Sequence, residues 1–77
     1  MSAWSEIKGE LVKKVKELFK DAEVSEYPYY IRVKIGEKSY RILYSYGQLR
    51  ILDEATKKVA ITGTLDKTIE TLKELIK

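Results

Sequence analysis

The arginines and tyrosines are the residues of this sequence whose types and spacing best suit binding chemistry. All three arginines and all six tyrosines lie within residues 27–52, where the only acid is Glu37. A guanidinium group is a planar donor fork that suits phosphate or carboxylate, and aromatic rings stack on nucleic-acid bases. This mixture predicts a binding surface.

The positive charge of the chain is concentrated in the same segment. Residues 27–52 carry five basic residues against one acid, a sum of +4, whereas residues 1–26 sum to −1 and residues 53–77 sum to zero. The flanking segments use only lysine and alternate it with acids, so their polar faces are expected to be nearly neutral and solvated.

Catalysis is not indicated, and we expect that the protein is not an enzyme. The chain has no cysteine and no histidine, which excludes thiol nucleophiles, imidazole bases and the usual zinc ligands. Asp53 and Glu54 are adjacent in a predicted turn and should point in different directions. The four glycines are too dispersed to form a phosphate-binding loop. We therefore expect no metal site and no cofactor.

Length and composition predict one small domain over residues 1–77. No apolar run is long enough to span a bilayer, so we expect a cytoplasmic protein with no membrane partner. Few thermolabile residues and many lysines and glutamates are typical of thermostable proteins from hyperthermophiles. A designed scaffold with no ligand would share this composition.

Two amphipathic helices are expected to support the central segment. Apolar residues recur every three or four positions from Ser2 to about Ala22, and again in a helix capped by Thr64 or Asp66. Residues 21–26 are predicted to be an acidic connection. From Tyr27 the apolar period changes to two, which indicates strands, with turns at Gly36-Glu37 and at Gly47.

A fourth strand is expected after a connection near residues 54–56. Its register is chosen so that Val59 and Ile61 point toward the helices and Lys58 points away. The sequence thus predicts an α+β two-layer sandwich, in which a four-stranded antiparallel meander has the N- and C-terminal helices packed on one face. Tyr27, Tyr29, Tyr40, Tyr44 and Tyr46 fall on the helix side by strand parity, either as core and rim residues or around a ligand cleft.

This order of elements is similar to that of the double-stranded-RNA-binding domain, which has three strands. That family has a lysine cluster at the start of its last helix. Residues 64–68 here have one lysine and one acid, so the resemblance implies no site residues.

The other face of the sheet is expected to be open, and strand parity assigns the candidate residues to it. Arg32 should lie opposite Arg41, with no acid in the predicted face to offset them. The predicted members of this face are Tyr30, Arg32, Lys34, Arg41, Leu43, Arg50, Leu52 and Lys58.

This face predicts a small nucleic-acid-binding protein that holds single strands with low sequence specificity. The arginines would pair with phosphates, Lys34 and Lys58 would add positive potential, and Tyr30 would stack on a base. One alternative is a protein–protein interaction or homodimerisation module in which Leu43 and Leu52 form the interface. Another is a solvated face with no partner.

Overall fold

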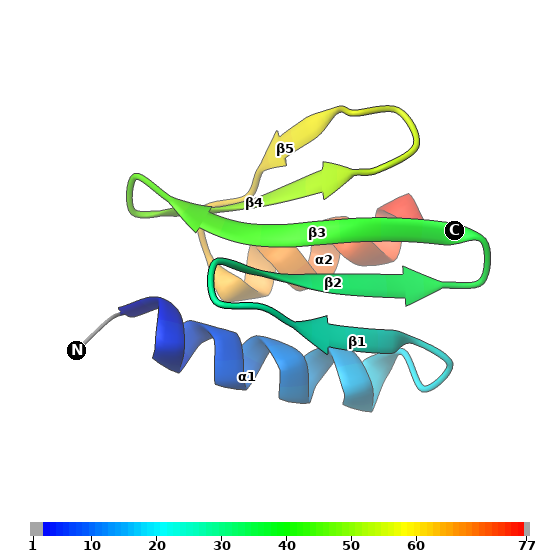
Figure 1. Ribbon diagram of the computed structural model, residues 1–77, viewed down its shortest axis with the longest axis horizontal. Coiled ribbons are helices and arrows are strands. Elements are labelled where there is room, and N and C mark those ends of the chain that lie inside the picture. The colour runs from blue at the N-terminus through cyan, green and yellow to red at the C-terminus, as the bar shows by residue number, and fades with distance from the viewer. Residues whose placement is uncertain (1–2, 77) are drawn as a thin grey trace.

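The chain folds into two helices and five strands in a computed structural model that describes residues 3–76 (Figure 1). Ser2, the predicted start of the first helix, lies outside the described residues. In chain order the elements are α1 (Ala3–Leu18), β1 (Glu23–Glu26), β2 (Tyr30–Ile35), β3 (Lys38–Ser45), β4 (Gln48–Asp53), β5 (Val59–Ile61) and α2 (Leu65–Leu75).

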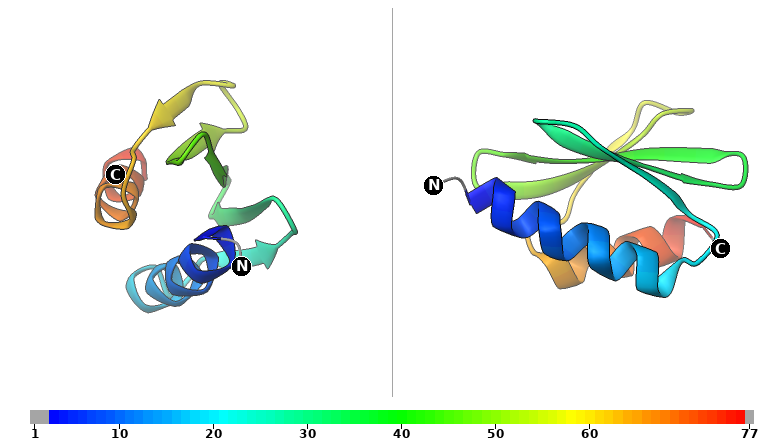
Figure 2. Two further views of the ribbon diagram at one scale, coloured as in Figure 1. Left: turned by 90° about the vertical axis from the view of Figure 1, so that its left-hand side faces the viewer. Right: turned by 60° about the horizontal axis from the view of Figure 1, so that its bottom comes forward.

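The predicted α+β architecture is confirmed. The strands form one antiparallel sheet in the order β1-β2-β3-β4-β5, and both helices lie on the same side of it (Figure 2). Each strand pairs with the next one along the chain, which makes the sheet a meander. No helix among residues 3–76 is long and apolar enough to cross a membrane.

The number of strands differs from the prediction because residues 23–26 form β1 and not a connection. Val24 pairs with Val33, which is fully buried and faces the helices. Glu23, Ser25 and Glu26 are exposed, so β1 has one apolar residue among four. Such a short and polar edge strand gives almost no alternating signal in the sequence.

The turns between β2 and β3 and between β3 and β4 lie where the sequence predicts them. Ile31 pairs with Ile42 and Arg32 with Arg41, as the Gly36-Glu37 turn predicts. Ser45 pairs with Gln48, which places the next turn at Tyr46-Gly47, where both residues have positive φ (54° and 75°). That pair of angles is typical of a type I′ turn.

The beginning of β2 was predicted three residues too early. The amide of Tyr27 donates to the carbonyl of Tyr30 at 2.9 Å, which closes a turn between β1 and β2. Pro28 lies in this turn, where a residue with no N–H is tolerated, and not inside a strand. The indole of Trp4 donates to the Pro28 carbonyl at 3.1 Å and ties the turn to α1.

The predicted register of β5 was wrong. Val59 pairs with Leu52 and Ala60 with Ile51, so Ala60 faces the helices while Val59 and Ile61 face away. The turn before β5 sets this register, because Asp53 Oδ1 accepts from the Ala55 amide at 2.9 Å and the Lys57 amide donates to the Asp53 carbonyl at 2.8 Å. Lys57 takes a φ of 64° to close the turn.

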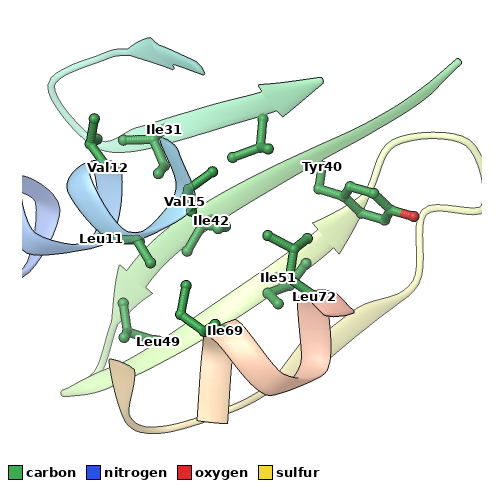
Figure 3. Close-up of a cluster of buried hydrophobic side chains, with 11 residues drawn as sticks. Leu11, Val12, Val15, Ile31, Tyr40, Ile42, Leu49, Ile51, Ile69 and Leu72 are labelled. Atoms are coloured by element: carbon green, nitrogen blue, oxygen red, sulfur yellow. The ribbon is translucent and has the colours of Figure 1, made fainter. Parts of the chain in front are cut away.

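The core lies between the sheet and the two helices (Figure 3). α1 contributes Leu11 and Val15, α2 contributes Ile69 and Leu72, and the hydroxyl of the buried Tyr40 donates to the Leu75 carbonyl at 3.3 Å. The side chain of Thr64 accepts from the Lys67 amide and caps α2, as one of the two predicted caps. The sheet residues of the core are Ile31, Val33, Tyr40, Ile42, Leu49 and Ile51.

Candidate functional site: the open face of the sheet

The face of the sheet that the helices leave uncovered gathers most of the predicted site residues, and we call it the open face (Figure 2). Register defines it, because residues that alternate with the buried Ile31, Val33, Ile42 and Ile51 must point the other way. From β2 to β4 the open face carries Tyr30, Arg32, Lys34, Arg41, Leu43, Arg50 and Leu52, as the sequence predicts.

Lys58 is the one predicted site residue that lies on the other face. The Asp53 amide donates to the Lys58 carbonyl at 2.9 Å, so Lys58 lies opposite Asp53. Asp53 in turn pairs with the buried Tyr40. The correction follows from the register of β5: moving the strand by one position turns Lys58 toward the helix side and Val59 away from it.

An acid that the sequence analysis missed lies between the two opposed arginines. Glu54 Oε2 accepts from the Nε of Arg32 at 3.0 Å and from the Nε of Arg41 at 2.9 Å. The second oxygen, Oε1, accepts from Arg32 Nη2 at 3.1 Å, so Arg32 holds the carboxylate with two donors. The expectation that no acid offsets these arginines was therefore wrong.

The position of Glu54 follows from the β3–β4 register. Its amide donates to the Ser39 carbonyl at 3.1 Å, which continues the pairing one step past the end of β4. Because Leu52 points to the open face, Glu54 points there too. That parity was the sequence signal that could have found it.

The two guanidinium groups strongly favour the ionised form of Glu54. Hydrogen bonds from Arg32 and then from Arg41 lower the pKa of the Glu54 carboxyl to about 2. The same contact raises the pKa of the Arg32 guanidinium. The cluster of Arg32, Arg41 and Glu54 thus has a net charge of +1 while Glu54 is ionised.

Aromatic rings extend this cluster toward both ends of the open face. Arg41 Cζ lies 5.2 Å from the centre of the Tyr30 ring, and Tyr30 stacks on Tyr27 with ring centres 4.8 Å apart. At the β3–β4 turn, Arg50 Cζ lies 6.0 Å from the centre of the Tyr46 ring. Both distances are within the range of cation–π contacts, so each of these two arginines has an aromatic ring beside its charged head.

Two of the tyrosines are thus displaced from the helix side predicted by strand parity. Tyr27 precedes β2 and Tyr46 lies in a turn, so neither obeys the alternation of a strand. Tyr29 also lies in a turn and is 83 % exposed. Tyr40 and Tyr44 do lie on the helix side, where Tyr44 stacks on Trp4 with ring centres 6.4 Å apart. The tyrosines therefore do not gather around one cleft.

The part of the open face over β3, β4 and β5 carries four apolar side chains around Arg50. Val59 is 53 % exposed and Ile61 is 59 % exposed, because the register of β5 turns both away from the core. Val59 pairs with Leu52, and Arg50 lies between Leu43 and Ile61 across the strands. We call Leu43, Leu52, Val59 and Ile61 the apolar block.

Arg50 crosses the apolar block with part of its charged head removed from water. Among the described residues, no acceptor reaches its buried Nε. A buried guanidinium N–H without an acceptor is costly and favours a partner that supplies one.

Comparison of the chain with protein-family models, with curated proteins and with solved structures gave no match.

Proposed function

We propose that the protein is a protein-interaction module that binds an amphipathic helix with acidic flanks across its open face. The observation that carries this proposal is the apolar block, which lies beside Arg41 and Arg50 on the side that no helix covers. Contiguous apolar surface of this kind, bordered by polar groups, is typical of protein-docking sites. Of the sequence-based alternatives, this is the protein–protein interaction function.

A helix is the element that best fits such a face. The opposite face of the same sheet already packs two helices through a stripe of β-branched and leucine side chains. The apolar block repeats that chemistry with Leu43, Leu52, Val59 and Ile61. A partner helix would complete a three-layer arrangement in which both faces of the sheet are buried.

The charge of the open face favours acidic flanks on that helix. Its basic residues are Arg32, Lys34, Arg41 and Arg50, and its acids are Glu54 and Glu23, which leaves an excess of two positive charges. Carboxylates on the partner would reach the exposed Arg41 side chain, and they would supply an acceptor to the buried Arg50 Nε once that side chain turns toward the partner. Tyrosine and arginine are also the residue types most enriched where interfaces bind strongly.

The geometry of Tyr46 supports a binding role for this face. Tyr46 has φ of 54°, a conformation that favours glycine or asparagine, and its side chain is 94 % exposed. A large aromatic residue at this position is unfavourable for the turn itself. Strained residues of this kind are concentrated at functional sites.

Nucleic-acid binding has less support than the sequence alone suggested. Glu54 occupies the fork of Arg32 and the Nε of Arg41, and Lys58 lies on the other face, so the open face offers fewer donors to the closely spaced phosphates of a nucleic-acid strand than the sequence predicted. The contacts of Arg41 with Tyr30 and of Arg50 with Tyr46 do resemble a base-stacking surface, so nucleic acid is included as an arm of the test.

The test uses two synthetic helical peptides that share the same leucine stripe, one with glutamate and one with lysine on the flanks. Fluorescence anisotropy should give the glutamate peptide a Kd on the order of 1–100 µM and the lysine peptide at least tenfold weaker binding. Equal affinity for the two peptides would contradict the proposal. Tighter binding of labelled single-stranded oligothymidine, displaced by neither peptide, would assign the face to nucleic acid.

Two variants localise the binding. The double change Val59→Thr and Ile61→Thr removes apolar surface from the block, keeps the branching that suits a strand, and should weaken the glutamate peptide at least tenfold. Leu18→Gln is the matched control, because Leu18 is 50 % exposed but belongs to α1 on the other side of the sheet. It should leave the affinity unchanged, and loss of binding in the control would contradict the assignment to the open face.

A further inference from the structure

Within residues 3–76, the border of the sheet at β5 presents main-chain groups that no neighbouring strand uses. The Asp53 amide donates to Lys58 and the Thr62 amide donates to Leu49, so residues 58 and 62 bond toward β4. In an antiparallel pair, alternate residues bond to the same neighbour, so Ala60 also bonds toward β4. The N–H and C=O groups of Val59 and Ile61 therefore point away from β4. β5 is the last strand in the sheet order, so these groups lie along its free edge (Figure 1).

A groove lies beside this edge on the helix side. It has a volume of about 440 Å³ and is lined by residues of β4, of β5, of their connecting loop and of the last turn of α2. Ile51, Ala60 and Leu75 form its apolar part, β5 borders it at Val59, and the remaining lining residues are the polar Asp53, Thr56 and Lys58. The small side chain of Ala60 is the inward-facing residue at the centre of β5, so it leaves room beside the edge.

The opposite border of the sheet is different. β1 carries Glu23 and Glu26, both exposed, and its one apolar residue, Val24, is packed against the core. Charged residues on an edge strand discourage the addition of another strand. The two edges of the sheet are thus unequal, and β5 is the one that has both unsatisfied backbone groups and an apolar groove.

We propose that the β5 edge and this groove form a strand-addition site for an extended peptide segment that places one large apolar side chain in the groove. Main-chain hydrogen bonds to Val59 and Ile61 would supply affinity that does not depend on sequence. Because side chains of a strand alternate, the residue between the two bonded positions of the peptide would point toward Ala60 and Leu75. The site uses the backbone of Val59 and Ile61 and the groove on the helix side, whereas the open face uses the side chains of these two residues, so the site does not depend on the helical partner.

A second copy of this chain fits the site less well than a peptide of that chemistry. The residues that β5 of a second copy would direct toward the groove are Lys58, Ala60 and Thr62, and none of them is a large apolar residue. The groove would remain largely empty in such a pair. Self-association through this edge is therefore an outcome that the test must be able to detect.

The test compares two blocked peptides of alternating valine and threonine, one with a central leucine and one with a central alanine. Backbone amide signals of Val59 and Ile61 should shift on titration, and their hydrogen exchange should slow at least tenfold when the leucine peptide binds. The leucine peptide should bind roughly 10- to 50-fold more tightly than the alanine peptide, because only leucine fills the groove. Equal affinities, or unchanged exchange at Val59 and Ile61, would overturn the proposal.

Two protein variants separate the edge from the groove. Ile61→Pro removes an outward N–H without removing a bond to β4, and it should weaken both peptides. Ala60→Leu fills the groove with the protein's own side chain, and it should abolish the preference for leucine while the alanine peptide still binds. Circular dichroism confirms that each variant is folded before it is compared. Retention of the leucine preference in a folded Ala60→Leu variant would contradict the role of the groove.

Failure of this site and failure of the proposed function are distinguishable. The Leu43→Thr protein loses apolar surface from the open face on β3 and leaves β5 and the groove unchanged, so it should still bind the leucine strand peptide within about threefold while its binding to the helical peptide weakens. Light scattering of the free protein tests for self-association through the β5 edge. A concentration-dependent dimer that Ile61→Pro abolishes would assign the edge to a second copy of the chain, and this would overturn the proposal of a peptide partner.

Discussion

Arg32 and Arg41 lie directly opposite each other on neighbouring strands and share a single carboxylate. Two like charges in such positions repel each other, and Glu54 offsets that repulsion from the next row of the sheet. One acid thereby holds two guanidinium groups in place at the centre of the open face. The repulsion between Arg32 and Arg41 is therefore offset while Glu54 is ionised.

Glu54→Gln should change how stability depends on pH. The folded-state pKa of Glu54 is about 2 and its ordinary value is 4.5, so the unfolded chain binds the proton at higher pH than the folded one. The wild-type protein should therefore keep this contribution above about pH 4.5 and lose it as the pH falls toward 2. Urea unfolding at a series of pH values measures how steeply the free energy of unfolding falls as the pH is lowered. The Glu54→Gln variant should be less stable than the wild type at neutral pH, and its free energy of unfolding should decline less between pH 4.5 and 2. The control is Glu37→Gln, in an exposed turn, which should resemble the wild type.

The register of β5 can be checked with the same substitution at two positions. Ile51 is 1 % exposed and Ile61 is 59 % exposed. Ile51→Thr places a hydroxyl in the core and should cost roughly 2 kcal/mol or more, whereas Ile61→Thr should stay within about 0.5 kcal/mol. Chemical denaturation measures both. Equal losses would mean that Ile61 points into the core.

Tyr40 should make the protein sensitive to alkali. Burial raises the pKa of its hydroxyl above the ordinary value of 10.0, and the Asp53 carboxylate adds to the rise. For an acid whose pKa is raised on folding, the stabilising contribution is present below the unfolded pKa and is lost as the pH rises through the folded one. Tyr40→Phe loses the hydrogen bond to Leu75, which should cost about 1 kcal/mol at neutral pH. Urea unfolding at a series of pH values measures the difference in free energy of unfolding between the variant and the wild type. This difference should narrow above about pH 10, and a difference that stays constant would contradict this role of Tyr40.

Tyr46→Asn should stabilise the protein and weaken its binding to the helical peptide. Asparagine followed by glycine is the preferred pair for a type I′ turn, so the change should gain roughly 0.5–1 kcal/mol. The variant also removes the ring under Arg50, so affinity for the glutamate peptide should fall several-fold. Thermal unfolding and anisotropy on the same sample measure the two effects. A variant that gains stability and keeps full affinity would show that Tyr46 has no part in binding.

The sheet positions that could be predicted are those set by short turns with glycine. Gly36 and Gly47 mark two tight hairpins, and each hairpin fixes the partner of every residue along its strands. These registers correctly predicted that Arg32, Arg41 and Arg50 lie on the same face of the sheet. The helices were also predictable, because their apolar stripes had to meet the apolar side of those strands.

The remaining positions depend on contacts that a pattern of residue types does not contain. The register of β5 is set by the hydrogen bonds of Asp53 and by the positive φ of Lys57, a residue that rarely adopts that conformation. β1 has a single apolar residue, and its existence depends on pairing with β2. The error in the register of β5 placed Lys58 on the open face and kept Val59 and Ile61 off it, so the predicted face was more basic and less apolar than the observed one.

The strand order has a consequence for how quickly the chain reaches its native state. Every pairing in the sheet joins strands that are consecutive in the chain, so each hairpin forms by closing a short loop. The most sequence-distant packing is that of α1 against α2, at the two ends of the chain. A topology with so few distant pairings belongs to the mixed α/β proteins that fold faster than sandwiches and barrels. Stopped-flow refolding should accordingly give a single phase on a timescale of about milliseconds.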